Sequence, residues 1–361
     1  MPPEISVVVP TFREAANLPV LIPRIAAALA GRDFEIIIAD DFSGDGADAA
    51  CAQLSEKYPL RLLSRRGARG LSAAVMDGIA AARGEIAVVM DADLSHPPEK
   101  IPELAAALQS GKADFAAGSR YAEGGGMSGD WPRLRRINSW GATMLARPLA
   151  PLADPMSGFF ALRRAQMPPS EILSPIGYKI GLEIIVKAGH AAGRIAEVPI
   201  FFGERQAGES KMTMREQLNY LRHLRRLYHY RWPKTMEALQ FGAVGATGFI
   251  WDIMFYYGLQ ALGAPHLWAR AAAFWPGATS NWFLNRIMTF KTRPRAAAAA
   301  QWAGFVAVSG AGFCVNWGMY ALLTVQTEFF MQHRFAAFIL GILAGAVFNF
   351  IAADRLIFRA K

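Results

Sequence analysis

Three long segments that are almost free of charged side chains constrain this chain more than any other feature. Residues 238–263 contain a single charged side chain, Asp252, and residues 302–325 and 335–353 contain none. About 20 consecutive apolar residues are enough for an α-helix to cross a lipid bilayer. The three segments therefore predict transmembrane helices. A buried helical bundle is the alternative interpretation.

A fourth span is predicted at residues 267–290, where the pattern is weaker. Arg270 lies near its start, and Pro276 and Asn281 interrupt it. We include it because two spans must return the chain to the side on which it started. The predicted domain over residues 235–361 is therefore all-α, with four transmembrane helices.

Basic residues flank the predicted spans unevenly. The segment 222–234 before the first span is basic, and so are the loop after the second span and the C-terminal end. The basic residues of the last two are Lys291, Arg293, Arg295, Arg355, Arg359 and Lys361. The opposite loops carry only Arg270 and Arg334. Because cytoplasmic loops carry an excess of Lys and Arg, we expect a multi-pass protein of the inner or plasma membrane with both termini and its N-terminal part in the cytoplasm.

The membrane segments also contain an internal repeat. The pattern from Phe241 to Asp252 resembles the pattern from Phe305 to Asn316, at a spacing of 64 residues. Two duplicated hairpins of like orientation would produce it, and chance similarity between apolar helices is the alternative. Residues 281–290, which read Asn-Trp-Phe-Leu-Asn-Arg-x-x-Thr-Phe, resemble the signature of the GtrA-like four-span family, which is linked to polyprenyl-phosphate sugars.

The first 200 residues have the alternating pattern of an α/β fold. Short β-branched or apolar runs predict strands at residues 5–9, 35–39, 61–63, 85–90 and 114–117. Helical segments such as 14–30 and 70–83 separate the first four. This alternation predicts right-handed crossovers and a mainly parallel sheet. Ligands of such sheets bind beyond the carboxyl ends of the strands, so the polar residues there are the candidates for a site.

Acidic loops follow three of the predicted strands. The loops contain Glu14 after the first strand, Asp40, Asp41 and Asp45 after the second, and Asp91 and Asp93 after the fourth. Helix capping and turn formation are the ordinary alternatives for such residues. Two carboxylates one residue apart on an extended segment can face one Mg²⁺ ion, which keeps coordination positions for phosphate oxygens. Three acidic loops at one edge of a sheet therefore favour a metal site that binds a nucleoside diphosphate.

With these loops the chain resembles the family 2 glycosyltransferases of the GT-A type, and most closely the dolichol-phosphate mannose synthases. The likeness runs from about Ile5 to Lys211. The matching motifs are at residues 9–14, 40–41, 91–99, 118–121, 154–160, 177–179, 197–200, 205 and 210–211. The resemblance implies a GT-A (Rossmann-like) catalytic domain at residues 1–211.

Residues 212–234 would link the two domains. Leu218, Leu221, Leu224 and Tyr228 recur three and four residues apart, and arginines occupy other positions. A basic amphipathic helix of this kind lies well on an anionic membrane surface. A packed linker helix is the alternative.

The resemblance also implies roles for the matching positions. The residues expected to bind a nucleotide-sugar donor are Pro10, Phe12, Glu14, Ala39, Asp41, Asp91, Ala92, Asp93, Lys179, Arg205 and Lys211. Asp91 and Asp93 would be the catalytic pair, because they would ligate a Mg²⁺ or Mn²⁺ ion. Relatives commonly have Gln at the position of Ser95, whose shorter side chain would reach the ion through a water molecule.

A second set of matching positions would hold the acceptor. Arg120, Arg135 and Ser139 are expected to bind the phosphate of a polyprenyl or dolichyl phosphate. Arg135 and Ser139 are four residues apart and would share one face of a helix. A phosphomonoester is largely ionised at neutral pH, since its second pKa is about 6. Such an acceptor needs positioning and no general base, so His96 is expected to shape its turn.

The implied reaction is an inverting transfer of mannose from GDP-mannose to the polyprenyl phosphate at the cytoplasmic membrane face, which yields a β-linked product. UDP-glucose is the alternative donor. The membrane helices could instead flip a lipid-linked sugar. They could also serve only as an anchor or as an oligomerisation surface, to which the small residues Gly341, Gly345 and Ala346 are suited. Nucleic-acid binding explains the charge poorly, because the basic residues crowd the positions next to the predicted spans.

Overall fold

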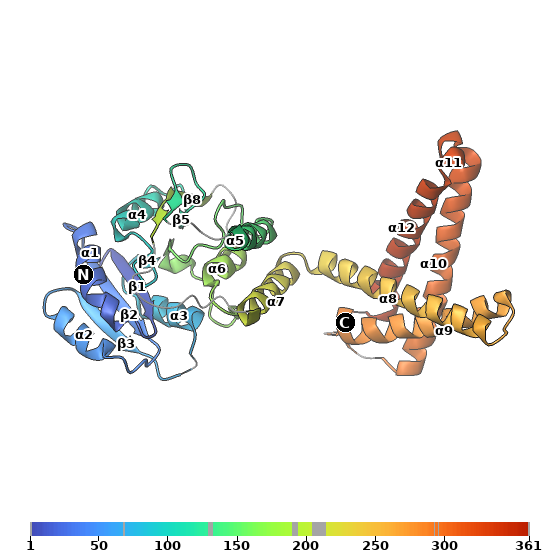
Figure 1. Ribbon diagram of the computed structural model, residues 1–361, viewed down its shortest axis with the longest axis horizontal. Helices are drawn as coiled ribbons and strands as arrows, with labels where there is room; N and C mark the ends of the chain where they lie inside the picture. Colours follow the sequence, from blue (N-terminus) through green and yellow to red (C-terminus); the bar gives the residue numbers. More distant parts are fainter. Residues whose placement is uncertain are drawn as a thin grey trace. The chain divides into compact units, whose positions relative to one another are not determined.

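A computed structural model describes residues 2–67, 69–128, 133–189, 194–203, 214–291, 293–294 and 296–359. The chain consists of two compact units, Met1–Arg231 and Trp232–Lys361 (Figure 1). Arg205 and Lys211 lie outside the described residues, and so does the side chain of Arg135.

A seven-stranded sheet forms the centre of the first unit, with the strand order β3-β2-β1-β4-β7-β5-β8. Its strands are β1 Ile5–Thr11, β2 Phe34–Asp40, β3 Leu60–Ser64, β4 Ile86–Val89, β5 Phe115–Ser119, β7 Phe160–Arg163 and β8 Ile195–Pro199. Neighbouring strands are parallel except where β7 pairs with β4 and with β5. The mainly parallel α/β sheet predicted from the sequence is therefore confirmed.

Helices cover both faces of the sheet. Those of the first unit are α1 Leu18–Ala28, α2 Ala47–Ser55, α3 Leu71–Ala81, α4 Ile101–Gln109, α5 Arg133–Ala146, α6 Ile180–Ala188 and α7 Met214–Arg231. Val7 and Val9 of β1 belong to one core cluster with residues of α1, α2 and α4. Val8 points to the other face, where Gly78 of α3 packs against it. Because successive side chains of a strand alternate between faces, a strand covered on both sides is buried throughout, as all seven residues of β1 are.

Two strands of this sheet, the antiparallel β7 and the edge strand β8, were not predicted from the sequence. Phe160 pairs with Val89 of β4 on one side and with Ala117 of β5 on the other. β7 therefore starts where β4 ends. This register brings the preceding loop, residues 154–159, to the carboxyl edge of the sheet.

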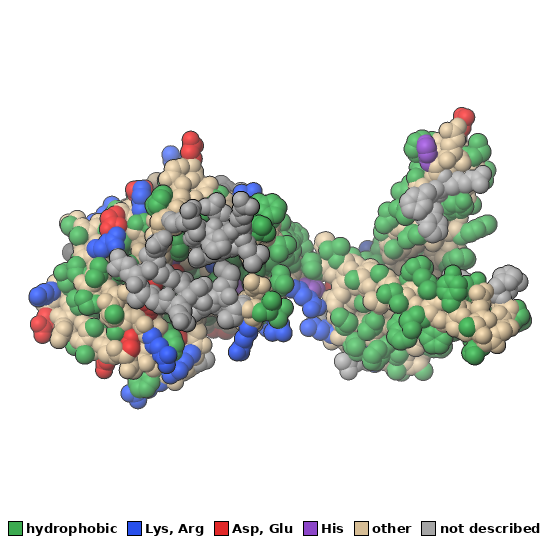
Figure 2. Space-filling view, in the orientation of Figure 1, with side chains coloured by type: hydrophobic (Ala, Val, Ile, Leu, Met, Phe, Trp, Pro, Cys, Tyr) green, Lys and Arg blue, Asp and Glu red, His purple; other side chains and the backbone are tan. Residues whose placement is uncertain are grey.

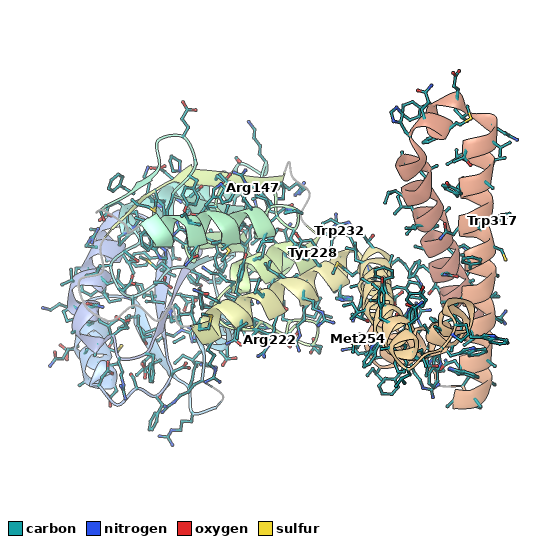
Figure 3. The ribbon with its side chains drawn as sticks, turned by 45° about the vertical axis from the view of Figure 1, so that its right-hand side comes forward. Arg147, Arg222, Tyr228, Trp232, Met254 and Trp317 are labelled. Atoms are coloured by element: carbon teal, nitrogen blue, oxygen red, sulfur yellow. The ribbon has the colours of Figure 1, made fainter. Side chains whose placement is uncertain are left out.

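Helix α7 packs on α5 and α6. Leu224 and Leu227 are buried, and the hydroxyl of Tyr228 donates a hydrogen bond of 2.9 Å to the backbone oxygen of Leu145, just before the end of α5 (Figure 3). The side chains of Leu218 and Leu221 on another face of α7 are about half exposed, at 49% and 50%. One face of α7 is thus packed, and another presents apolar and basic side chains to the outside.

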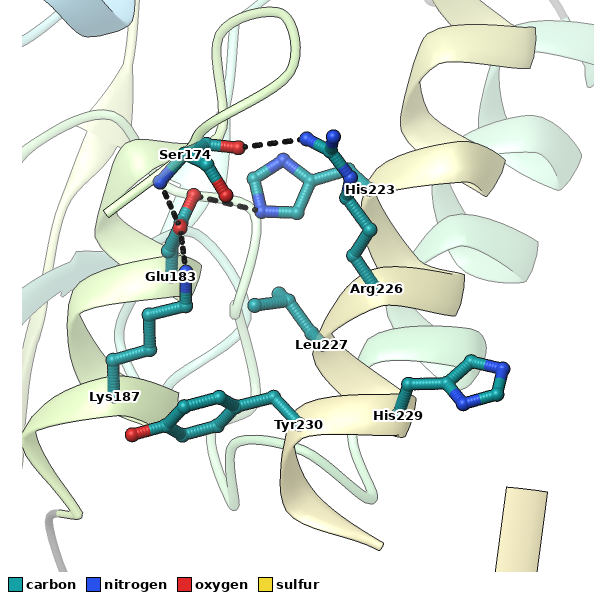
Figure 4. Close-up of a pocket in the computed structure, with 8 residues that line it drawn as sticks. All are labelled: Ser174, Glu183, Lys187, His223, Arg226, Leu227, His229 and Tyr230. Carbon is teal, nitrogen blue, oxygen red and sulfur yellow. Dashed lines mark hydrogen bonds and ion pairs between the residues drawn. The ribbon is translucent and has the colours of Figure 1, made fainter. Parts of the chain in front are cut away.

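A cavity of about 350 Å³ lies between α6 and α7 (Figure 4). Glu183 of α6 accepts a hydrogen bond of 2.7 Å from the backbone N–H of Ser174 and pairs with Lys187. Its second oxygen lies 3.4 Å from Nε2 of His223 on α7, and both side chains are buried. Since α6 begins directly after Lys179, this buried contact connects α7 to a segment that carries a predicted donor-binding residue.

The second unit is helical. Its elements are α8 Pro233–Ala261, α9 His266–Leu284, α10 Ala298–Gln326, α11 Glu328–Gln332 and α12 Arg334–Ala352, with the π-helices η5 Asn285–Thr289 and η6 Ala353–Ile357. Among the described residues, three helical segments are long and apolar enough to cross a membrane: Pro233–Ala261, Ala298–Gln326 and Ile339–Ile357. Hydrophobic side chains accordingly dominate the visible face of these helices (Figure 2). Helix α9 forms where the fourth span is predicted, but it is not among the three.

The predicted repeat is visible in this unit. Asn281 of α9 packs on Gly248 of α8, and Asn349 of α12 packs in the same way on Gly312 of α10. The two hairpins, α8–α9 and α10–α12, each continue into a five-residue π-helix. Equivalent phenylalanines of the two hairpins meet, since the ring centroids of Phe290 and Phe358 are 4.5 Å apart.

An ionic cluster joins the two hairpins near these phenylalanines. Arg293, which follows η5, pairs with Glu237 of α8 and with Asp354 of η6. Lys234 lies 2.8 Å from Asp354. Arg293 also donates a hydrogen bond of 2.8 Å to the backbone oxygen of Phe358. The start of α8 is thereby held to the end of the last helix.

Two of the small residues suggested as an oligomerisation surface serve another purpose. A Cβ atom at Gly345 would lie 2.8 Å from the backbone oxygen of Gly312, and one at Gly341 would lie 2.8 Å from the backbone oxygen of Asn316. Both glycines therefore allow α12 to approach α10 within one chain, which corrects their assignment to a surface between chains.

We expect Gly345→Ala to destabilise the second unit and Gly318→Ala to leave it intact. The added methyl group at position 345 meets backbone that cannot rotate away, whereas position 318 of α10 has open space around it. Overpacking of this kind costs about 1–3 kcal/mol. Thermal unfolding of the full chain in detergent, followed by tryptophan fluorescence, measures the difference, and equal midpoints would show that α10 and α12 do not pack closely.

Candidate active site

Three strained loop residues mark the carboxyl edge of the sheet. Arg13, Phe42 and Leu94 have φ angles of 62°, 51° and 63°, and they are the non-glycine residues with positive φ in the described part of the chain. They follow β1, β2 and β4. A positive φ strains the backbone of a residue that has a side chain, and such backbone strain is concentrated at functional sites. The three loops that the sequence singles out are thus also the ones with unusual backbone.

The loop after β2 is held by its two aspartates. Asp40 accepts hydrogen bonds from the hydroxyl of Thr11 at 3.1 Å and from the backbone N–H of Ser43 at 3.0 Å. Asp41 forms a buried ion pair with Arg65 and accepts a hydrogen bond of 2.7 Å from the N–H of Gly70. The carboxylate of Asp41 thereby fixes the loop after β2 to the loop after β3.

The predicted nucleoside-pocket residues lie at the ends of β1 and β2 and in the loops that follow them. Pro10 and Ala39 are buried and are paired in the parallel register. The guanidinium groups of Arg13 and Arg69 lie 5.3 and 5.4 Å from the ring centroid of Phe12. Glu14 accepts a hydrogen bond of 2.6 Å from the side chain of Asn17, which orients its carboxylate.

The loop after β4 presents one carboxylate and buries the other. The side chain of Asp91 is 30% exposed, whereas Asp93 and its neighbour Ala92 are buried. Asp93 accepts hydrogen bonds from the backbone N–H of Ser95, at 3.1 Å, and from its hydroxyl. The hydroxyl of Ser95 therefore orients Asp93.

His96 shapes this loop as a neutral side chain. Its Nδ1 accepts a hydrogen bond of 3.1 Å from the backbone N–H of Asp91, and its ring stacks on Phe159 at 5.2 Å. Complete burial lowers the pKa of His96. An acceptor nitrogen held in this way supports the turn, as expected, and leaves the loop without a cationic imidazole.

Two further segments approach the acidic loop. A Cβ atom at Gly158 would lie 3.4 Å from Oδ2 of Asp91, in van der Waals contact, so glycine leaves this side of the carboxylate uncovered. Gly203 donates a backbone hydrogen bond of 2.9 Å to the oxygen of Ser95. Gly203 is the last described residue before the stretch that contains Arg205 and Lys211.

Arg120 is held by a buried partner. Its Nε and Nη2 donate to the two oxygens of Asp154 at 2.7 and 2.8 Å. Burial opposes both charges, yet the paired hydrogen bonds prevail: they raise the pKa of Arg120 and lower that of Asp154. Arg120 therefore holds Asp154 in place within the fold. Ser139, another predicted acceptor residue, lies 2.9 Å from the hydroxyl of Tyr121.

Lys179 lies near the acidic loop, and its ammonium group has a lowered pKa. Its Nζ donates a hydrogen bond of 2.6 Å to the backbone oxygen of Met156 and lies 4.6 Å from the ring centroid of Tyr178. Burial and the charge of Arg120 lower its pKa to about 8. An ammonium group in this state gains stability from any anion that binds beside it.

The acidic loop has the donor atoms for a divalent cation. Within the described residues no three Asp, Glu, His or Cys side chains form a cluster, and the carboxylates that this loop offers are those of Asp91 and Asp93. Mg²⁺ is typically bound through one or two carboxylates, and phosphate oxygens and water complete its shell. The partly exposed Asp91 beside Gly158 fits that mode of binding.

Three arginines at the same edge were not predicted as site residues from the sequence. Arg65, Arg66 and Arg69 follow β3 and surround a cavity of about 290 Å³ together with Phe42 and Gly67. The sequence did indicate them, because ligands bind beyond the carboxyl ends of parallel strands and these arginines follow the predicted strand at residues 61–63.

Two family descriptions match the chain. Residues 6–167 match glycosyl transferase family 2, and residues 240–358 match the GtrA/DPMS transmembrane domain.

Three dolichol-phosphate mannosyltransferases are similar to this chain over most of its length. A dolichol-phosphate mannosyltransferase of Pyrococcus furiosus is 39% identical over 89% of this chain and 90% of its own length. The dolichol-phosphate mannosyltransferase of Mycosarcoma maydis is 45% identical over 63% and 80%, and that of Saccharomyces cerevisiae is 39% identical over 70% and 95%. Among solved structures, glucosyl-3-phosphoglycerate synthase from Mycobacterium tuberculosis is 22% identical, with a TM-score of 0.47 over 63% of this chain and 80% of that one.

We expect Arg120→Gln to lower the free energy of unfolding by about 3–5 kcal/mol, because a neutral side chain leaves the buried carboxylate of Asp154 without its cationic partner. Arg24→Gln is the matched control. Arg24 makes the same two-bond contact with Glu99, at 3.0 Å for each bond, but in solvent, where such a pair contributes about 0–1 kcal/mol. Thermal unfolding of both variants checks the difference, and equal stability would free Arg120 for a purely ligand-binding role.

Proposed function

The chain belongs to the dolichol-phosphate mannosyltransferase family, and on that premise we propose that it transfers mannose from GDP-mannose to a dolichyl or other polyprenyl phosphate. The observation that carries the proposal is that the charge of Lys179 interacts with Asp91 of the acidic loop at the sheet edge, in a chain that also has apolar helices long enough to cross a membrane. Its relatives' names and its two matched domains support the same activity.

The donor half of the site has to stabilise a leaving diphosphate. Lys179 would bind the diphosphate, and the negative charge of the diphosphate would stabilise the protonated form of Lys179. Asp91 and Asp93 would hold a Mg²⁺ or Mn²⁺ ion, which would neutralise negative charge on the phosphate oxygens when bound. Ser95 would keep Asp93 in position through its two hydrogen bonds. Arg205 and Lys211 remain predicted donor-binding residues.

The acceptor half needs no general base. A polyprenyl phosphate already carries a nucleophilic oxygen, since the second pKa of a phosphomonoester is about 6. The neutral His96, with Nδ1 already accepting a hydrogen bond, agrees with this requirement. Arg135 and Ser139 would orient the acceptor phosphate, and Arg120 would contribute with nitrogen atoms that Asp154 does not use. A single displacement inverts the sugar carbon and gives a β-linked product.

Membrane attachment would bring the lipid acceptor within reach. We assign the catalytic unit and both termini to the cytoplasmic side, from the excess of basic residues next to the predicted spans. The exposed Leu218 and Leu221 of α7, with arginines on the same helix, suit the headgroup layer of an anionic membrane. Four membrane spans, including α9, remain our proposed topology.

A transfer assay with the full chain in lipid vesicles tests the proposed function. We expect mannose from GDP-mannose to reach a polyprenyl phosphate, and glucose from UDP-glucose not to do so. Asp93→Asn should reduce kcat at least about a hundredfold, because even residues that only support metal ligands typically contribute 10–100-fold. Asp33→Asn, at an exposed position before β2, is the control. Transfer from UDP-glucose alone, or full activity of Asp93→Asn, would contradict the assignment.

The affinity for GDP should depend on pH through Lys179. Its lowered pKa of about 8 means that the free protein loses this charge above pH 8. Because the bound diphosphate favours the charged form, affinity should be level below pH 8 and then fall by up to about tenfold per pH unit. Calorimetric titrations from pH 6.5 to 9.5 measure the curve. Lys179→Arg should abolish the decline, and an unchanged decline in that variant would exclude Lys179 as its source.

A further inference from the structure

The cavity beside the donor site is built from side chains suited to one ring system. It has a volume of about 290 Å³ and lies between the ends of β2 and β3, where Asp40 and Ser64 are paired in register. Its walls include Phe42 and three arginines. Two of these arginines, Arg66 and Arg69, take no part in the reaction proposed above.

Arg65 forms the rigid back of this cavity. It is buried and bridges two carboxylates, Asp41 and Asp77, with 2.7 Å between its Nε and Asp77. Asp41 in turn accepts the hydrogen bond from Gly70. The charge of Arg65 is therefore already neutralised inside the protein, and its role is to hold the two loops together.

Arg66 and Arg69 differ from Arg65 because no carboxylate among the described residues pairs with either of them. The guanidinium of Arg66 lies 5.1 Å from the ring centroid of Phe42, and that of Arg69 lies 5.4 Å from that of Phe12. Nη2 of Arg69 also lies 3.5 Å from the backbone oxygen of Phe42, a long contact. Stacking on a ring orients a guanidinium and leaves its donor edge available.

Phe42 is exposed to solvent although its side chain is apolar. Its side chain is 51% exposed, and its φ of 51° is strained for an aromatic residue. A flat apolar ring next to oriented guanidinium groups provides both a stacking surface and a hydrogen-bonding edge. Nucleobases are recognised by this combination.

The donor edges of the two arginines distinguish between bases. Guanine presents N7 and O6 as adjacent acceptors, and arginine binds this pair with two parallel hydrogen bonds. Adenine replaces O6 by an amino donor. Uracil has no pair of adjacent ring-edge acceptors, since its two carbonyl groups flank an N–H donor. A site with arginine forks and a stacking ring therefore favours guanine.

We propose that Arg66 and Arg69, together with Phe42, bind the guanine base of the donor and set the preference for a GDP-linked over a UDP-linked sugar. This inference rests on the proposed function, because it assigns the base of the same donor. It separates recognition of the base, by the loops after β2 and β3, from recognition of the diphosphate, by Lys179 and the acidic loop.

Calorimetric binding of GDP and UDP to the full chain, in detergent with Mg²⁺, tests the inference. Arg66→Ala and Arg69→Ala should each weaken GDP binding about tenfold to a hundredfold, which is the range for losing a two-bond contact to guanine. UDP binding should change less than about threefold. Arg69→Lys keeps the charge and loses the fork, so it should lose most of the preference as well. Arg83→Ala, at an exposed arginine just after α3, is the control for net charge.

The outcomes separate the inference from the proposed function. Equal weakening of GDP and UDP would mean that the arginines act on phosphate charge, and unchanged GDP binding would mean that the cavity does not hold the base. Either result overturns the inference while transfer from GDP-mannose by the unmodified chain still supports the proposed function. An unmodified chain that transfers only from UDP-glucose would overturn both.

Discussion

A sheet that is covered on both faces can expose polar side chains only where its strands end, and the first unit is organised by this constraint. All seven residues of β1 are buried, and the residues that follow β1, β2, β3 and β4 carry the acids, arginines and strained backbone of the candidate site. The antiparallel β7 adds a loop to the same edge, because it enters the sheet where β4 ends. The candidate site is thus formed by several loops that meet at this edge of the sheet.

Charges at this edge fall into two groups. Arg65 with Asp41 and Arg120 with Asp154 are buried pairs that neutralise one another and fix loops. Removing one partner of such a pair leaves an uncompensated charge, so these pairs define geometry. Lys179 and the partly exposed Asp91 are less fully compensated and can respond to a charged ligand. Rigid pairs surrounding responsive groups give a preorganised site.

Features that depend on neighbouring residues were predicted well from the sequence. Strands β1 to β5 follow from short apolar runs, and the acidic loops follow from the residues next to them, whereas β7 and β8 were not predicted. Features that depend on distant partners were not. Asp154 lies 34 residues from Arg120, and nothing near either residue signals that they form a buried pair. Likewise, the sequence suggested Gly341 and Gly345 for contacts between chains, whereas in the structure both glycines pack against α10 of the same chain. The roles of Asp91, Arg135 and the other site residues stay predictions.

The repeat in the second unit has a consequence for how that unit is assembled. Where equivalent residues such as Phe290 and Phe358 meet each other, two copies of one surface are in contact, as in a homodimer with two-fold symmetry. The segment between the hairpins makes this association intramolecular, so it proceeds at a high effective concentration and does not depend on the amount of protein in the membrane. It also allows the copies to diverge, as Asn285 and Ala353 have done at equivalent positions. A symmetric pair joined in one chain can hold a single asymmetric site.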